Sequence, residues 1–428
     1  PCALVMPRAV AASQCQSVLL IGALPAQYCT VTADQIFTGT IFSADADQIL
    51  APSFGSTSVA PFSAIVLQGP ITTFTNSGTI DLRPSANQVP SNQSRLFAGI
   101  HANQGSVSNI INRGTIVAAP GELIVLSLFG EGWQNSRTDE NYNRAAIAVT
   151  GANVGTITNE ATGSLYGTVL VSGTTSRVTT ILNQGSMGFR PLLFQDIPLP
   201  QNVSPPPGSV STPTRPDSDA DPDTFPDPLT STGQTSTVFA ASAVNVASGA
   251  RVTSIINEGT ATIRAESGIV VEDNAVVTTI QNLGTLSGRD APDFGAIVVR
   301  TQGRVDLIEN RGTSEGGVFL RLSSGGSVGT VLNEGTIRGG IELRDDGPVT
   351  ERLALLENSG VLKGPSAINI SSARVGTIVN SGTIRGLTGP GISLLGVRGL
   401  FDSGSNDPAL SRDAAFVGLI QNLAGAEI

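Results

Sequence analysis

The residues that could carry chemistry are few, and one group is an acidic run in a Pro-rich segment. Its alternating carboxylates are Asp217, Asp219, Asp221 and Asp223. This spacing is typical of a calcium loop, because Ca2+ takes about six to eight oxygen ligands. An EF-hand would also need Gly at its sixth position and Glu at its twelfth, where the chain has Pro222 and Pro228. The run therefore predicts either a weak calcium site or a solvated acidic linker.

A second candidate site is the polar segment 130–143, which carries the only tryptophan. Trp133 occurs there together with Arg137 and Tyr142. Aromatic side chains among polar groups suit contact with a glycan or a protein. In the alternative interpretation, Trp133 packs this loop onto the body of the protein.

Catalytic arrangements are hard to assemble from this sequence. The chain has one histidine, His101, which a serine protease would need as its base, and its one Asp-Ser-Gly stands far away at 402–404. Glycoside cleavage needs a pair of carboxylates across the scissile bond. Glu309 and Glu357 precede repeated asparagines whereas Glu334 follows one, so they do not form one aligned site. We expect no enzyme, with a polysaccharide-degrading enzyme as the alternative, and an ordinary surface or corner position for His101.

All three cysteines lie in the first thirty residues, at Cys2, Cys15 and Cys29. This distribution is typical of exported proteins that have at most one local disulfide. A disulfide between Cys15 and Cys29 would close a short loop and leave Cys2 over. The alternative is three unpaired thiols.

Composition and charge exclude further classes of protein. The chain of 428 residues has 49 Gly, 40% hydrophobic residues and only 4% aromatic residues, which predicts a sizeable core of aliphatic side chains. Its 24 basic and 34 acidic residues leave a net charge of -10. Neutralisation of phosphates is the main source of affinity for nucleic acids, so we expect no nucleic-acid partner.

A repeated pattern, V-x-x-I-x-N-x-G-T-[I/L], dominates the sequence and occurs eleven times. Its asparagines are Asn76, Asn112, Asn159, Asn183, Asn257, Asn282, Asn310, Asn333, Asn358, Asn380 and Asn422. From Asn257 to Asn380 they follow one another at steps of 25, 28, 23, 25 and 22 residues. A period of this size indicates one coil of a solenoid.

The residues of each repeat predict the element. Val, Ile and Thr dominate, Gly interrupts them, and helical spacing is missing, so the elements are short strands. A second apolar stretch recurs between the asparagines, for example at 268–271 and 295–299. Three short strands per coil, stacked on the strands of the next coil, predict an all-β, right-handed parallel β-helix.

The repeated Asn and Gly are expected at a corner of the coil. We expect Asn to tolerate left-handed dihedral angles there and its amide to bond the same residue of the next coil, which makes a ladder. The glycines two positions later are expected to supply a second positive-φ position. The clearest of them are Gly114, Gly259, Gly284, Gly335 and Gly382.

The predicted organisation is one rod with additions. Residues 1–60 lack the repeat and are expected to cap the first coil, 61–197 and 237–428 to form the β-helix, and 198–236 to be a flexible Pro- and Asp-rich insertion. An open last coil would leave unpaired backbone groups. We therefore expect either further chain or another chain to cover it.

Over residues 65–428, this Asn-Gly-Thr-Ile repeat resembles the β-helical passenger regions of bacterial autotransporters and related surface adhesins. The resemblance implies export across the outer membrane, with an outer-membrane translocator as partner if the precursor has one, and display at the cell surface. It implies a structural or adhesive protein whose partner is a host or neighbouring-cell surface, recognised through glycan or protein. Self-assembly of copies into a filament or surface layer is the alternative, and no cofactor other than calcium is expected.

Overall fold

The computed structural model is built from strands throughout its described part. It describes residues 18–19, 27–38, 40–42, 62–82, 97–118, 144–191, 237–239, 242–289, 294–344, 351–371, 373–395 and 415–428. No helix occurs in these ranges, and hence none long and apolar enough to cross a membrane.

Three parallel sheets of twelve strands each run the length of the molecule. Sheet A consists of β1 (Val18–Leu19), β4 (Thr40–Phe42), β7 (Thr79–Leu82), β10 (Thr115–Ala118), β13 (Ser164–Tyr166), β16 (Ser186–Met187), β21 (Thr262–Arg264), β24 (Thr285–Gly288), β27 (Thr313–Gly316), β30 (Thr336–Arg338), β33 (Val361–Gly364) and β36 (Thr383–Gly386). Sheet B consists of β2 (Gln27–Val31), β5 (Phe62–Gln68), β8 (Phe97–Gln104), β11 (Arg144–Thr150), β14 (Thr168–Ser172), β19 (Ser242–Ala247), β22 (Ser267–Val271), β25 (Gly295–Val299), β28 (Leu320–Leu322), β31 (Ile341–Arg344), β34 (Ile368–Ser371) and β37 (Ile392–Leu395). Sheet C consists of β3 (Gln35–Phe37), β6 (Ile71–Asn76), β9 (Ser106–Asn112), β12 (Asn153–Asn159), β15 (Arg177–Asn183), β20 (Arg251–Asn257), β23 (Val276–Asn282), β26 (Arg304–Asn310), β29 (Ser327–Asn333), β32 (Glu351–Asn358), β35 (Arg374–Asn380) and β38 (Phe416–Asn422).

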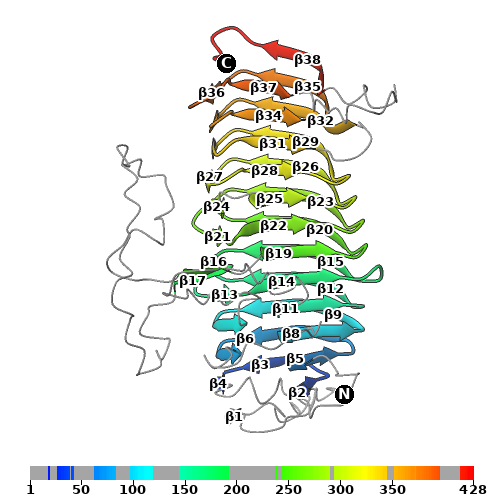
Figure 1. Cartoon of the computed structure of the whole chain (residues 1–428). Helices are drawn as coiled ribbons and strands as arrows, with labels where there is room; N and C mark the ends of the chain where they lie inside the picture. The colour runs from blue at the N-terminus through cyan, green and yellow to red at the C-terminus, as the bar shows by residue number, and fades with distance from the viewer. Residues whose placement is uncertain are drawn as a thin grey trace, which may run out of the picture.

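The predicted parallel β-helix is therefore confirmed. Each coil contributes one strand to sheet B, one to sheet C and one to sheet A, and the coils stack into a rod with the two termini at opposite ends (Figure 1). The strand register keeps equivalent repeat residues together, as in Val252 beside Val277 and Asn257 beside Asn282. Inward-facing aliphatic residues from all three sheets form one continuous core, because strand side chains alternate between the two faces.

The longest gap between repeats does not interrupt the stack. Strands β14, β15 and β16 pair in parallel with β19, β20 and β21, so Asn183 lies beside Asn257 although 74 residues separate them in sequence. Strands β17 (Phe189–Pro191) and β18 (Thr237–Phe239) pair antiparallel where the chain leaves and rejoins the rod. The acidic run with its four Asp residues lies outside the described residues.

The three sheets start earlier than the repeat does. Strands β1 to β4 lie within residues 1–60, and β2, β3 and β4 pair with β5, β6 and β7. Phe37 occupies the position that Asn76 occupies in the next coil, which is why the motif does not reveal this first coil. That residues 1–60 act as a cap stays a prediction.

Left-handed backbone occurs at a different corner from the one predicted. The non-glycine residues with positive φ in the described chain are Ser248, Asp273, Asn274, Thr301, Gln302 and Ser324. All of them lie between a sheet B strand and the following sheet C strand, and none is a repeat asparagine. The expectation that the repeat asparagines adopt left-handed angles is wrong, because they close regular strands of sheet C.

One coil has an exchange of large and small core residues. Ser314 is fully buried in the inward row of sheet A, between Leu286 and Ile337, and its Oγ has no hydrogen-bond partner. Phe319 is fully buried at the start of the following sheet B strand, where neighbouring coils have Ala296 and Gly340. We infer that the Phe319 ring fills space that a larger residue at position 314 would occupy.

Glycine contacts in other coils support this pairing of positions. A Cβ atom at Gly268, which is equivalent to Phe319, would lie 2.8 Å from Cδ1 of Leu286. A Cβ atom at Gly99 would lie 2.7 Å from Cγ2 of Ile116. Large residues of sheet A therefore lie over small residues of sheet B, and this coil reverses the sizes.

A double-mutant cycle tests the exchange. Phe319→Ala alone leaves a cavity and should lower the free energy of unfolding by about 3–5 kcal/mol, and Ser314→Leu alone overfills the coil and should cost about 1–3 kcal/mol. The double variant restores the usual pattern, so urea unfolding should give a cost at least about 1 kcal/mol below the sum. Additive costs would show that the two positions do not share space.

Candidate functional site

The eleven repeat asparagines form one row along the edge of sheet C. Ten hydrogen bonds of 2.7–2.9 Å join them, each from Nδ2 of one asparagine to Oδ1 of the asparagine in the next coil towards the C-terminus. Ten of the eleven side chains are at most 1% exposed, and Asn422 at the end is exposed. The row, called the asparagine ladder below, is therefore a directed chain of amide groups inside the rod.

The second N–H of each amide also finds an acceptor. Asn159 Nδ2 lies 3.1 Å from the Ser186 carbonyl oxygen, and Asn257 Nδ2 lies 3.0 Å from that of Thr285. In these coils the amide ties sheet C to sheet A of the next coil as well as to its own equivalent, whereas Asn76 and Asn310 use the carbonyl oxygens of Gly78 and Gly312 in their own corner. Since a buried amide without partners is costly, this saturation explains why a polar side chain is tolerated there.

Both ends of the asparagine ladder are closed by local contacts. At the start, the Gly78 N–H donates to Asn76 Oδ1 at 3.2 Å, and buried Phe37 takes the equivalent position in the coil below. At the other end, Asn422 Nδ2 donates to the Ala426 carbonyl oxygen at 3.2 Å. Every asparagine of the row therefore uses its amide.

The corner glycines are needed for close approach of the backbone, and the expected positive φ is wrong. None of Gly114, Gly259, Gly284, Gly335 and Gly382 has positive φ. A Cβ atom at Gly335 would lie 2.2 Å from the Gly312 carbonyl oxygen, and one at Gly382 would lie 2.1 Å from that of Gly360. The cause is that two successive N–H groups, of Glu334 and Gly335, donate to the single Asn310 carbonyl oxygen and pull the corner onto the coil below.

Gly259 differs from the other four glycines. A Cβ atom there would meet nothing closer than the Leu283 carbonyl oxygen at 3.9 Å. The corner after Asn257 is two residues longer, and Ala261 is the residue that precedes Thr262 where Gly284 precedes Thr285. Gly259 therefore has the glycine position of the motif but lies in a longer turn, where it makes no close backbone contact.

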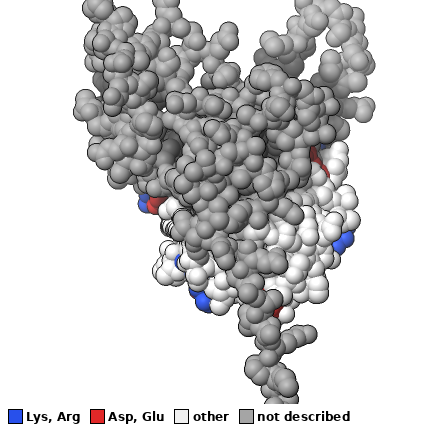
Figure 2. Space-filling view, turned by 90° about the horizontal axis from the view of Figure 1, so that it is seen from below, with Lys and Arg blue, Asp and Glu red and all other residues white. Residues whose placement is uncertain are grey.

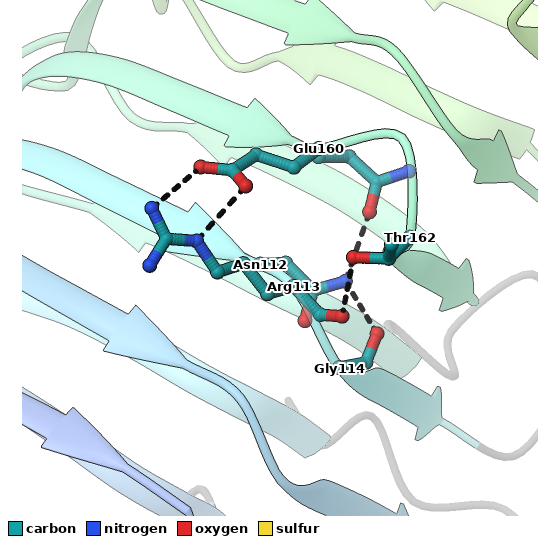
Figure 3. Close-up of polar contacts among 6 residues, drawn as sticks. Asn112, Arg113, Gly114, Glu160 and Thr162 are labelled. Atoms are coloured by element: carbon teal, nitrogen blue, oxygen red, sulfur yellow. Dashed lines mark hydrogen bonds and ion pairs between the residues drawn. The ribbon is translucent and has the colours of Figure 1, made fainter.

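Five of the eleven residues that directly follow the asparagines are charged, and some of them pair on the outside of the corner. Arg113 makes a bidentate ion pair with Glu160 of the next coil, at 2.9 and 3.0 Å (Figure 3). In the same close-up, the Thr162 hydroxyl donates to the Arg113 carbonyl oxygen at 3.0 Å. Arg311 likewise pairs with Glu334 at 3.0 Å. These ion pairs connect neighbouring coils on the outer surface, whereas the asparagine ladder connects the same coils in the interior.

His101 is buried, so the expected surface or corner position is wrong. It lies in β8 between Val66 and Ala148 of the neighbouring strands and is 5% exposed. Its Nδ1 is 3.0 Å from Ser63 Oγ and its Nε2 is 2.7 Å from Thr150 Oγ1. Burial lowers the pKa of His101 from 6.5 to about 4, so the imidazole is neutral near pH 7.

Two of the described carboxylates near the asparagine ladder share one arginine. Glu309 pairs with Arg311 at 2.6 Å, and Glu334 pairs with the same arginine from the next coil. Glu357 stands in the same row as Glu309 but two coils away, with Leu332 between them. Across the part of the chain that is described, no three His, Cys, Asp or Glu side chains group closely enough to hold a metal ion.

Several predicted site residues lie outside the described residues. They are Trp133, Arg137, Tyr142, Asp217, Asp219, Asp221, Asp223 and Cys15. Cys29 is described, buried and disulfide-bonded, and its pairing with Cys15 stays a prediction. The Asp-Ser-Gly at 402–404 is also outside, so the hydroxyl groups described beside His101 come from Ser63 and Thr150.

The sequence matches no protein-family model, no curated protein and no solved structure. The fold therefore rests on the strand pairing described above. The likeness to autotransporter passenger regions rests on the repeat.

Replacing one asparagine tests the ladder. Asn310→Ala leaves Asn282 Nδ2 and Asn333 Oδ1 buried without their partner and should lower the free energy of unfolding by about 2–5 kcal/mol. Asn422→Ala at the exposed end is the matched control and should cost less than about 1 kcal/mol. Urea unfolding measures both, and equal costs would contradict a buried ladder that stabilises the rod.

The pKa of His101 predicts how stability depends on pH. The unfolded chain takes up a proton on this residue near pH 6.5, whereas the folded chain does so only near pH 4, so acidification favours unfolding over this window. From pH 7.5 to pH 5 this residue alone should cost about 2 kcal/mol. His101→Gln should lose that part of the pH dependence in urea unfolding, and identical pH profiles for both proteins would disprove it.

Proposed function

We propose that this chain is the β-helical stalk of an extracellular structural and adhesive surface protein, of the kind found in autotransporter passenger regions. One observation carries the proposal: the asparagine ladder and three sheets continue from coil to coil without a break between Asn76 and Asn422. An uninterrupted stack suits a protein whose work is to hold contact sites at a distance from a surface.

The stack supports a mechanical role. Twelve strands at about 4.8 Å per coil give a rod of about 50 Å in this chain. Backbone hydrogen bonds of three sheets and the amide bonds of the ladder all run along its axis. Each coil contacts only its neighbours, so such a rod lengthens by adding coils without changing its cross-section.

The chain between the strands supports a display role. Strands β10 and β13 pair although residues 119–143 come between them in sequence, and β15 and β20 pair although residues 192–236 come between them. Insertions of this kind tolerate variation because the register of the rod does not depend on them. Segment 130–143, with Trp133, is the candidate for a glycan or protein contact.

Ion pairing of the carboxylates favours the stalk over a polysaccharide-degrading enzyme. General acid–base cleavage needs two carboxyl groups that face one substrate. Among the described residues, Glu309 and Glu334 share Arg311, and Glu342 pairs with Arg321 at 2.7 Å. In the view from below, the surface that is not drawn in grey is mostly white, with a few blue and red residues (Figure 2).

Surface labelling of whole cells tests the proposal. In cells that make the natural full-length protein, antibody raised against this chain should label intact cells, and external protease should remove the signal. A cytosolic protein that remains protected is the control. Label that appears only after cells are permeabilised would refute a surface role.

Adhesion is tested separately with the purified chain. Beads coated with it should attach to cells or to a glycan surface, and Trp133→Ala should reduce attachment at unchanged unfolding. Ordered polymers of the purified chain by electron microscopy, without bead attachment, would replace the adhesive part by self-assembly. If the beads attach no better than albumin-coated beads and no polymers form, both adhesion and self-assembly are rejected and only the structural role of the stalk is kept.

A further inference from the structure

Three basic side chains stack in register on the outer face of sheet A near its C-terminal end. Arg338, Lys363 and Arg385 lie on β30, β33 and β36 and are direct strand neighbours. Arg385 is exposed, and the other two are half-buried. Lys363 is also the chain's only lysine. These three residues are called the basic row below.

Stacking of like charges is unfavourable for folding, because residues directly opposite on neighbouring strands lie close together. Elsewhere the chain places opposite charges at such positions. The ion pairs between coils are Arg113 with Glu160, Arg289 with Glu266, Arg300 with Glu272, Arg311 with Glu334, and Arg321 with Glu342. Lys363 and Arg385 depart from this arrangement, whereas Arg338 has Glu315 opposite it in the preceding coil.

A shorter exception exists on another face. Arg177 and Arg251 are in register on β15 and β20 of sheet C, and both are exposed. A valine, Val276, follows Arg251 in the next coil. This pair does not extend to a third coil, so it provides a control that has the same chemistry on a different sheet.

Lys363 and Arg385 are available to a ligand. Neither makes an ion pair with any residue in the described part of the chain. Glu315 precedes Arg338 by one coil, and Ser287 precedes Glu315, so the row of positive charge begins at Arg338. The basic row is therefore a short linear track of cations that runs along the rod axis.

Hydroxyl groups flank this track. Thr336 and Thr383 lie two residues before Arg338 and Arg385 and share their face of the sheet, because strand side chains alternate. Both threonines are half-buried. Hydroxyl groups beside cations can bond the neutral groups of a ligand whose acidic groups face the cations.

We propose that the basic row binds an acidic polysaccharide that lies along the rod. Neighbouring coils are about 4.8 Å apart, which is similar to the advance of one sugar residue in an extended chain. Carboxylate groups on such a chain therefore meet Lys363 and Arg385, which lie one coil apart in register. The inference rests on the proposed adhesive function and names the ligand class and the residues that bind it.

Single-stranded nucleic acid is the competing polyanion. Its phosphates carry one negative charge per nucleotide, and the chain's net charge of -10 repels either polyanion outside the basic row. A uronic acid polymer also carries one charge per unit, but it has many hydroxyl groups, which suit the flanking threonines. The experiment below therefore includes both polymers.

Binding of polygalacturonate by the whole purified chain tests the inference. Lys363→Gln with Arg385→Gln should raise the Kd at least about tenfold at low salt, because two charge-assisted contacts are lost. The control Arg177→Gln with Arg251→Gln removes the same two charges from sheet C and should change the Kd less than about twofold. Neutral dextran should not bind.

Three results would overturn the inference: equal losses in both double variants, no binding of polygalacturonate, or tighter binding of an oligo-dT strand than of polygalacturonate. In urea unfolding, the Lys363 and Arg385 double variant should be at least as stable as the parent, because the repulsion between the two stacked cations is removed. Surface labelling of cells remains an independent test. If cells are labelled but the parent chain does not bind polygalacturonate, the basic row is rejected as a binding site and the stalk is kept. Binding without surface label rejects the proposed function and keeps the row.

Discussion

The amide–amide hydrogen bond between asparagines of successive coils is the constraint on which the rest of the rod depends. Each buried amide needs a partner at one fixed distance in the coil above and another in the coil below, so any change in coil rise or in corner position breaks two bonds at once. At six of the asparagines, including Asn310, the backbone carbonyl oxygen accepts two N–H groups, which presses the following backbone onto its neighbour. Position 335 is glycine because a Cβ atom there would collide with the Gly312 carbonyl oxygen of the neighbouring coil.

Constraints on the other two sheets are looser, and the sequence uses that freedom. Sheet B has a buried histidine among apolar neighbours, and one coil exchanges the sizes of Ser314 and Phe319. The long segments that separate successive strands fall between sheets A and B, as at 119–143, or between sheets B and C, as at 396–414, and not at the asparagine corner. A rod fixed along one edge can therefore carry variable segments elsewhere, which is what a stalk that displays contacts requires.

The fold could be predicted from sequence because the repeat reports the period, the strand residues and the corner together. The stacking of the asparagines could also be predicted, because Asn257 and Asn282 are one period apart in sequence and therefore occupy equivalent positions in successive coils. The backbone angles of the corners could not be predicted from the sequence. Asn and Gly suggest left-handed turns, yet the left-handed residues, such as Thr301, stand at a corner without a constant motif. Burial of His101 was also hidden, because alternation along a strand does not tell which outer faces are covered.

An isosteric replacement of one ladder amide tests the central claim most directly. Asn310→Asp keeps the size and the acceptor but removes the Nδ2 donor to Asn333 and buries a charge in the row. The account predicts that Asn310→Asp is less stable than the parent in urea at pH 7 by about 2–5 kcal/mol. Burial raises the carboxyl pKa above its unfolded value, so the deficit relative to the parent should shrink as pH falls and a protonated carboxyl donates to Asn333. Equal stability of Asn310→Asp and the parent at pH 7 would contradict a directed amide ladder as the basis of the rod.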